Sequence, residues 1–214
     1  MAFQVDIQFP QGQLIANSDT PQALRNSVSA GVCFTIALDW ANAIRQGTPL
    51  DLGRVKMGWV MSRQEQYFNS TVDGLPPMAA PWMRMAADRS YKAVVHHSLL
   101  HGYKTKLLMF DKPNDDLRKT LVTKLLAYKA IHITYFYPMN GGVGPQPAAG
   151  HTVAIAWNDG KPLYFDPNLC QVSDSDPISV AAAVDELMGL TPGEGWADQF
   201  TANGNRRFTL IGIN

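Results

Sequence analysis

The sequence predicts an α+β fold in a single domain, residues 1–214, with helices in its first half and an antiparallel sheet in its second. Residues 33–46 repeat apolar side chains every three or four positions, which is the spacing of a buried helix face. Residues 131–137 are a β-branched and aromatic run, typical of a strand. A hairpin turn signal, Asn158-Asp159-Gly160, separates strand-like residues 152–157 from residues 162–165. Helices and strands that segregate along the chain in this way favour one core.

The remaining elements follow from the same patterns. Residues 1–20 are expected to form an irregular arm, in which alternating residues 5–9 can make one short edge strand. The helix over residues 33–46 should stop at Gly47-Thr48-Pro49. Further helices are expected over residues 55–70, 82–102, 114–129 and 178–189. Further strands are expected over residues 104–110 and 206–213.

Composition excludes several classes of protein. Hydrophobic residues make up 46% of the chain and charged residues 17%, so the sequence is not of the disordered, highly charged type. Lysine plus arginine equals aspartate plus glutamate, at 18 each, which leaves no net charge to attract nucleic acid or an anionic membrane. No apolar run reaches the roughly 18 residues of a membrane span. The first residues lack the basic and apolar regions of a Sec signal peptide.

Three short segments carry a cysteine, a histidine and an aspartate in that order. They are Gly31-Val32-Cys33-Phe34-Thr35, Gly150-His151-Thr152-Val153 and Tyr164-Phe165-Asp166-Pro167-Asn168. A cysteine is a nucleophile only as the thiolate, which is favoured beside an imidazolium and at a helix N-terminus. Cys33 opens the predicted helix, whereas His151 and Asp166 lie at the edges of predicted strands. The sequence therefore predicts a Cys-His-Asp catalytic centre.

The predicted hairpin supplies the geometry for this centre. His151 and Asp166 lie at the outer ends of two antiparallel strands, so the carboxylate can bind one ring nitrogen and fix the tautomer. The other ring nitrogen is then available to take the thiol proton and return it to a leaving amine. An oxyanion hole is expected from the backbone N–H of Cys33 and a side-chain amide, for which Asn26 is the first choice and Gln22 the second.

Several of these residues have other interpretations when each is taken alone. A lone cysteine at a helix start is usually a small core residue, and Cys170 is interpreted in that structural way. His97 and His101 have a spacing that can chelate zinc on a helix, but the His-Glu-x-x-His pattern is absent. With His96, they are expected to form a solvated or core-edge cluster. No metal and no cofactor is predicted. The order of Cys33, His151 and Asp166 favours catalysis.

These motifs also resemble a known family. Gly31-Val32-Cys33 followed by Trp40, then Gly150-His151, then Phe165-Asp166-Pro167-Asn168 are similar to the YopT/AvrPphB-type bacterial effector cysteine proteases of the papain-like clan. The resemblance covers residues 26–170 in order and spacing. It implies a papain-like fold in which the nucleophile helix packs on the antiparallel sheet.

The resemblance also implies roles for residues and a place of action. Cys33 would be the nucleophile, His151 the general base and Asp166 the orienting carboxylate. Members of the family are delivered into host cells and cleave host proteins. The resemblance thus implies a secreted bacterial effector or toxin, without a Sec signal peptide, that acts in the cytoplasm of a host or competitor cell on a protein substrate.

Three functions remain open from the sequence. The first is a cysteine protease. The second is a glutamine deamidase or transglutaminase-like acyl transferase, because the same triad forms an acyl-enzyme in each reaction. The third is a non-enzymatic binding module in which Cys33 is merely buried. A His151 that points away from Cys33 would support the third.

Overall fold

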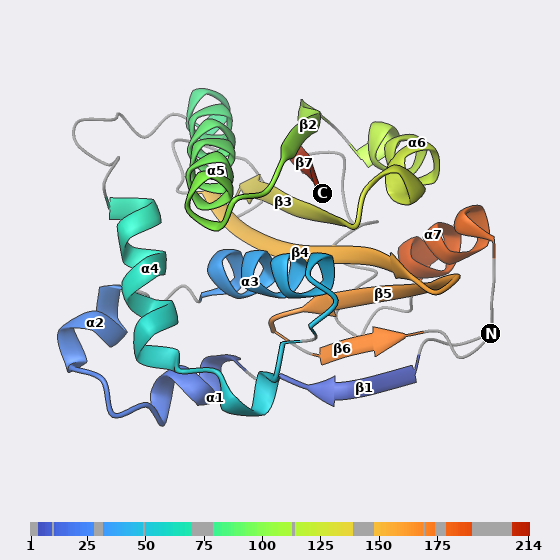
Figure 1. Cartoon of the computed structure of the whole chain (residues 1–214). Helices are drawn as coiled ribbons and strands as arrows, with labels where there is room; N and C mark the ends of the chain where they lie inside the picture. Colours follow the sequence, from blue (N-terminus) through green and yellow to red (C-terminus); the bar gives the residue numbers. More distant parts are fainter. Residues whose placement is uncertain are drawn as a thin grey trace.

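Seven strands form one antiparallel sheet, with helices packed against it (Figure 1). The computed structural model describes residues 4–9, 11–27, 32–48, 50–69, 79–112, 114–138, 148–168, 170–173, 179–189 and 207–214. Within these ranges the sheet has the strand order β1-β6-β5-β4-β3-β7-β2. The α+β class and the packing of helices on an antiparallel sheet are confirmed.

The elements have the following bounds. The strands are β1 (Gln4–Gln8), β2 (Thr105–Lys112), β3 (Ala130–Pro138), β4 (Ala148–Asn158), β5 (Lys161–Asp166), β6 (Cys170–Ser173) and β7 (Arg207–Ile213). The helices are α1 (Gln11–Ala16), α2 (Gln22–Ser27), α3 (Cys33–Arg45), α4 (Met57–Asn69), α5 (Ala79–His101), α6 (Asn114–Lys124) and α7 (Val180–Gly189). Two short 3-10 helices are η1 (Leu52–Arg54) and η2 (Leu125–Ala127).

Several elements differ from the sequence-based expectation, among them α1, β6 and α6. Part of the arm expected to be irregular forms helix α1, whose Gln11 and Ile15 are buried. Strand β6 was not predicted, because Val172 is its one strongly apolar residue and pairing with β1 and β5 decides its conformation. The helix expected over residues 114–129 ends at Lys124 and continues as η2. In each case tertiary contacts outweigh the local pattern.

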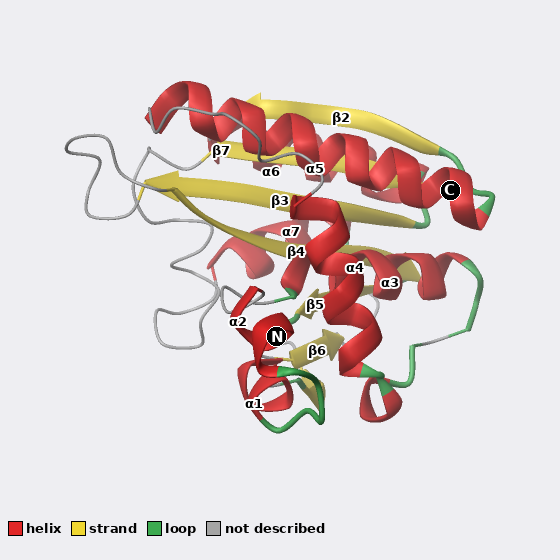
Figure 2. Cartoon of the chain, turned by 90° about the vertical axis from the view of Figure 1, so that its left-hand side faces the viewer, coloured by secondary structure: helices red, strands yellow, loops and turns green. Residues whose placement is uncertain are grey.

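The sheet separates two apolar clusters. Along β4, Ala154 and Ala156 belong to a cluster with side chains of α3, α4 and α5, whereas Val153 and Ile155 belong to a cluster with side chains of α6 and α7. Successive side chains of a strand point to opposite faces, so the two clusters lie on opposite faces of the sheet. The small alanines on one face let helix α3 lie close along β4, as Figures 1 and 2 show.

Helix α3 is anchored to the sheet by Trp40. Its indole is fully buried and stacks on the Phe165 ring of β5, with 5.6 Å between the ring centroids. The indole Nε1–H donates to Gln171 Oε1 on β6 at 2.7 Å. A buried tryptophan needs such an acceptor. This contact fixes the direction of the helix that begins at Cys33.

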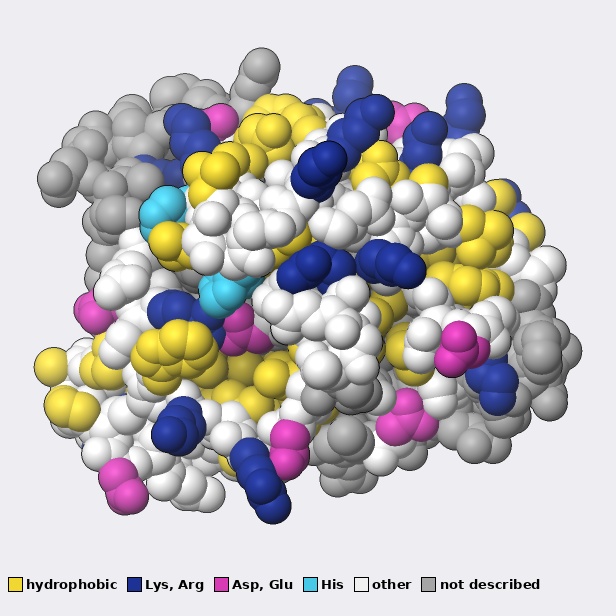
Figure 3. All heavy atoms as spheres, viewed as in Figure 1, with side chains coloured by type: hydrophobic (Ala, Val, Ile, Leu, Met, Phe, Trp, Pro, Cys, Tyr) yellow, Lys and Arg dark blue, Asp and Glu magenta, His cyan; other side chains and the backbone are white. Residues whose placement is uncertain are grey.

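The described surface carries charges of both signs. In the view of Figure 3, lysine and arginine side chains are interspersed with aspartate and glutamate side chains. Large hydrophobic side chains are exposed at Trp59, Leu99, Leu100 and Leu126. No helix in the described part of the chain is long and apolar enough to cross a membrane.

A buried histidine on β3 makes the fold sensitive to acid. His132 has no exposed surface, and its Nε2 lies 3.5 Å from the carbonyl oxygen of Phe34 in α3. Burial lowers the pKa of His132 to about 3, although the bond to Phe34 acts in the opposite direction. In the unfolded chain its pKa returns to the ordinary value of 6.5. Between these two pH values His132 is protonated in the unfolded state and neutral in the native state.

We therefore expect the free energy of unfolding to fall as the pH drops from 6.5 towards 3. Each unit of the pKa difference contributes about 1.4 kcal/mol. Urea unfolding at a series of pH values would measure this fall in the free energy of unfolding. His132→Gln should make the free energy depend less on pH in the acid range. His96→Gln, at an exposed position of α5, is the matched control and should leave it unchanged. An identical acid slope in His132→Gln and the wild type would contradict the assignment.

Candidate active site

The start of helix α3 is held by two glutamine side chains. Val32 occupies the position before the helix and has no side-chain cap of its own. Its backbone N–H donates to Gln11 Oε1 at 2.9 Å, and the N–H of Thr35 donates to Gln64 Oε1 at 3.0 Å. The first N–H groups of a helix have no acceptor within the helix. The N–H of Cys33 belongs to the same set, which leaves it suited to bind an anionic oxygen.

Cys33 is the first residue of α3 and carries an unpaired thiol. It is 7% exposed, so its side chain is almost completely buried. Gly31, which the sequence motif includes, lies outside the described residues. The helix N-terminus brings the positive end of the helix dipole to the sulfur.

The β4–β5 hairpin brings His151 and Asp166 together. Its register pairs Ala154 with Phe165 and Asn158 with Lys161, so the outer ends of the strands meet. His151 Nε2 donates to Asp166 Oδ1 at 2.8 Å. Asp166 is fully buried, and its Oδ1 also accepts the backbone N–H of Asn168 at 2.8 Å. This carboxylate is therefore fixed by the turn that follows β5.

His151 lies between the carboxylate and the thiol. Its Nε2 is hydrogen-bonded to Asp166, and Cys33 is close enough to affect its ionisation. Burial favours the neutral ring, but the charges of Asp166 and Cys33 and the hydrogen bonds to them outweigh it and raise the pKa of His151 to about 10. Because Nε2 is bound to Asp166, Nδ1 is the nitrogen left for the thiol. The arrangement can hold an imidazolium beside a thiolate.

The two predicted side-chain donors of the oxyanion hole, Asn26 and Gln22, both lie on helix α2. Asn26 lies on α2, but its side chain is outside the described residues, so its role stays a prediction. Gln22 is exposed on the same helix. One of the two amides that the structure places beside the start of α3 is that of Gln11, which is 5% exposed. Sequence reasoning missed it because the arm was expected to be irregular, and its position between apolar Phe9 and Ile15 is a weak signal.

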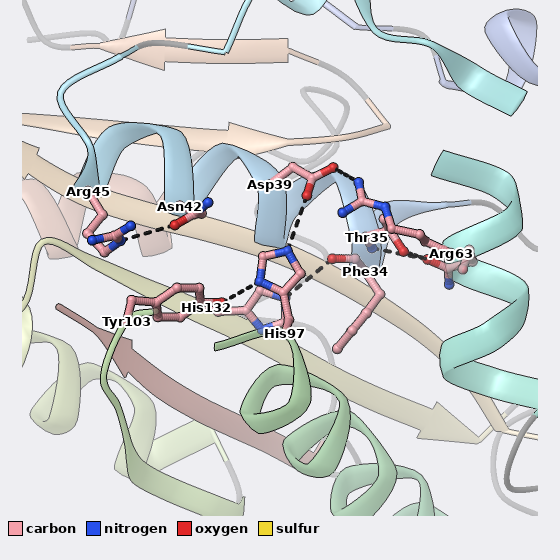
Figure 4. A network of polar contacts seen from close by, with 10 residues as sticks. Phe34, Thr35, Asp39, Asn42, Arg45, Arg63, His97, Tyr103 and His132 are labelled. Carbon is pink, nitrogen blue, oxygen red and sulfur yellow. Dashed lines mark hydrogen bonds and ion pairs between the residues drawn. The ribbon is translucent and has the colours of Figure 1, made fainter. Parts of the chain in front are cut away.

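The histidines of α5 belong to a polar network on another side of α3 (Figure 4). His97 is buried, with Nδ1 2.7 Å from the Tyr103 hydroxyl and Nε2 3.4 Å from Asp39 Oδ1. Asp39 lies on α3 and also pairs with Arg63 of α4. His101 stacks on His97 with 4.2 Å between the ring centroids, and burial and then the charge of His97 lower the pKa of His101. The network ties α3 to α4 and α5.

Metal ligands do not gather within the described ranges. No group of three histidine, cysteine, aspartate or glutamate side chains is placed there to hold an ion. The i, i+4 pair on α5 instead contacts Tyr103 and Asp39, as Figure 4 shows for His97. Those two histidines therefore support the packing of helix α3.

Comparisons with known proteins find matches among solved structures. No protein-family model matches the chain, and no curated protein matches it. Among solved structures, the chain is similar to the crystal structure of the Pseudomonas avirulence protein AvrPphB. The similarity covers 94% of this chain and 99% of that chain, with a TM-score of 0.49 and 14% sequence identity.

Proposed function

We propose that this chain is a papain-like cysteine protease, with Cys33 as nucleophile, His151 as general base and acid, and Asp166 as the orienting carboxylate. The observation that supports this proposal is the environment of His151, whose Nε2 is hydrogen-bonded to Asp166 and whose pKa is raised by both Asp166 and Cys33. A histidine in a purely structural role has no need of both partners. The motif resemblance described above agrees with these roles.

The chemistry follows from the geometry. The Cys33 thiolate attacks the carbonyl carbon of an amide, and the negative oxygen that forms is stabilised by the N–H of Cys33 and a side-chain amide. His151 gives its Nδ1 proton to the leaving amine, whose bond to the carbonyl carbon breaks, and an acyl-enzyme remains. His151 then takes a proton from water, which attacks the thioester and releases the acid and the thiol. Asp166 stays ionised and holds the ring.

Glutamine deamidation and transglutamination use the same steps up to the acyl-enzyme, with ammonia as the leaving group. A protein substrate of a host or competitor cell, reached by secretion, is part of the proposal and comes from the motif resemblance. The low exposure of Cys33 is the one observation that favours a binding module. The reactivity of the Cys33 thiol distinguishes a binding module from an enzyme.

We expect iodoacetamide to alkylate Cys33 at about pH 6, where an ordinary thiol is almost fully protonated. His151→Ala should reduce this rate by about 10- to 100-fold, because the imidazolium that stabilises the thiolate is removed. Mass spectrometry of the peptide that contains residue 33 measures the rate separately from Cys170. His96→Ala, at an exposed position, is the matched control. A Cys33 that stays inert until the protein unfolds would leave the binding module as the better account.

A screen for the reaction follows a positive result. New protein N-termini in a treated proteome would identify a protease, whereas conversion of glutamine to glutamate without cleavage would identify a deamidase. Cys33→Ala serves as the inactive control in both assays. Cleavage that persists in Cys33→Ala would reject the assignment of the nucleophile.

A further inference from the structure

A buried side chain of the N-terminal arm joins the two halves of the candidate active site. Gln11 is the first residue of α1 and is almost completely buried. Its Oε1 accepts the N–H of Val32, the residue before Cys33, at 2.9 Å. Its Nε2 donates to Oδ1 of Asn168, in the turn after Asp166. One amide thus bonds both segments that carry the proposed triad.

The backbone of Gln11 belongs to the hairpin side of the site. Strand β1 pairs with β6, which in turn pairs with β5. The Phe9 ring packs edge-to-face on the Phe165 ring, with 5.7 Å between the centroids, and Phe165 directly precedes Asp166. The N–H of Gln11 donates to the carbonyl oxygen of Phe9 at 2.9 Å. The arm is thus fixed on β5 and β6, and the Gln11 side chain reaches across to α3.

The far end of this bridge contacts both members of the His–Asp pair. The backbone N–H of Asn168 donates at 2.8 Å to Asp166 Oδ1, the oxygen that also accepts from His151 Nε2. Asn168 Nδ2 lies 3.3 Å from Nδ1 and 3.5 Å from Nε2 of His151. Nearly equal distances to the two ring nitrogens place this amide over the face of the imidazole. Asn168 therefore packs on the ring and leaves Nδ1 to the Cys33 thiol.

The orientation of the Gln11 amide is fixed by its partners. A backbone N–H can only donate, so the oxygen of Gln11 faces Val32 and its NH2 group faces Asn168. If either bond is lost, a buried polar group is left without a partner, which is unfavourable. The amide therefore favours one separation between the start of α3 and the turn after β5.

We propose that Gln11 is a positioning residue, which holds the start of α3 against the turn after β5 and so keeps the Cys33 thiol within reach of His151. This inference rests on the proposed function. The attraction between a thiolate and an imidazolium falls with their separation, and a misplacement of about 1 Å can cost an enzyme about 100-fold in rate. Within the described residues, the titratable groups that face His151 are Asp166 from β5, Cys33 from α3 and Tyr135 from β3, whose ring centroid lies 5.7 Å away.

The test is the pH profile of Cys33 alkylation by iodoacetamide in the full chain. Gln11→Met keeps the size of the side chain but has neither the oxygen that faces Val32 nor the NH2 group that faces Asn168. It should raise the pH midpoint of the profile by about one unit, so that alkylation at pH 6 is about tenfold slower. Gln13→Met makes the same change at an exposed position of α1 and should leave the midpoint unchanged.

A second glutamine separates positioning from simple support of the helix. Gln64 Oε1 accepts both the N–H and the hydroxyl of Thr35, and these two bonds stay on α3. Gln64→Met should therefore lower the melting temperature, as Gln11→Met does, yet shift the midpoint far less. Equal midpoint shifts in the two variants would show that support of the helix start explains the effect, and would overturn the proposal.

Asn168→Ala breaks the same bridge from its exposed end, and it serves as the test if Gln11→Met does not fold. It should shift the midpoint in the same direction. The double variant should shift the midpoint little further than Gln11→Met alone, because both changes remove one bridge. Additive shifts would show that Gln11 does not act through Asn168.

This inference and the proposed function fail in different ways. A wild-type Cys33 that is inert in the folded protein would reject both. A reactive Cys33 that depends on His151, with the wild-type midpoint in Gln11→Met and in Asn168→Ala, would reject the role of Gln11 alone. Circular dichroism and thermal unfolding of each variant show whether the fold is retained.

Discussion

Replacement of Asp166 by alanine is expected to slow the acyl-transfer reaction by about 10³- to 10⁴-fold, as removal of the orienting carboxylate does in other triads. Without the carboxylate, burial is offset only by Cys33, and the pKa of His151 falls from its raised value. The ring also loses its acceptor at Nε2. The measurement is kcat/KM on a substrate found in the proteome screen. Asp166→Asn keeps an oxygen acceptor for His151 but removes the charge, so it should also be strongly impaired.

Asp166→Ala should also destabilise the protein by about 3–5 kcal/mol at neutral pH, because one partner of a buried ion pair is removed. The pKa of His151 is higher in the folded state than in the unfolded state, so its contribution to stability is complete below pH 6.5 and is lost as the pH rises through 10. The stability difference between wild type and Asp166→Ala should shrink over that window. Asp19→Ala, at an exposed position, is the control. An Asp166→Ala protein with wild-type stability and activity would contradict the role of this carboxylate.

Replacement of Trp40 by alanine should reduce the free energy of unfolding by about 3–5 kcal/mol, the range for a large buried aromatic side chain. The change opens a cavity against Phe165 and leaves the Gln171 amide without its donor. Urea unfolding measures the loss. Because Trp40 anchors the helix that begins at Cys33, alkylation of Cys33 should also lose its dependence on His151.

Two variants define this prediction. Trp40→Phe keeps an aromatic ring and loses the N–H, so it should be destabilised by less than Trp40→Ala. Trp59→Ala removes a tryptophan that is 59% exposed and should change stability little. Equal stability losses in Trp40→Ala and Trp59→Ala would show that the indole of Trp40 does not hold α3 on the sheet.

Part of the site could be predicted because it depends on local sequence. A hairpin turn signal fixes which strand ends meet, and this placed His151 beside Asp166, 15 residues apart. The helical spacing of apolar residues identified α3, with Cys33 as its first residue. Periodicity and turn chemistry act over short distances along the chain.

The rest depends on contacts between distant segments. Gln11 and Asn168 are 157 residues apart, and no periodic pattern relates them. Strand β6 gains its conformation from pairing with β1 and β5, and its sequence alone does not indicate it. Polar side chains such as Gln11 and Gln64 are buried because helix N–H groups need acceptors. These N–H groups need side-chain acceptors only once the helix is packed, so the local sequence does not indicate which side chains will accept from them.

The position of β7 has a consequence for biosynthesis. This strand comes last in the sequence, yet it lies inside the sheet between β3 and β2 and pairs with both. While the ribosome is still making residues 207–213, β2 has no neighbour and the sheet is divided. Assembly of the complete sheet must therefore follow translation of this strand. A nascent chain would carry Cys33 for most of its synthesis before the scaffold around it is complete.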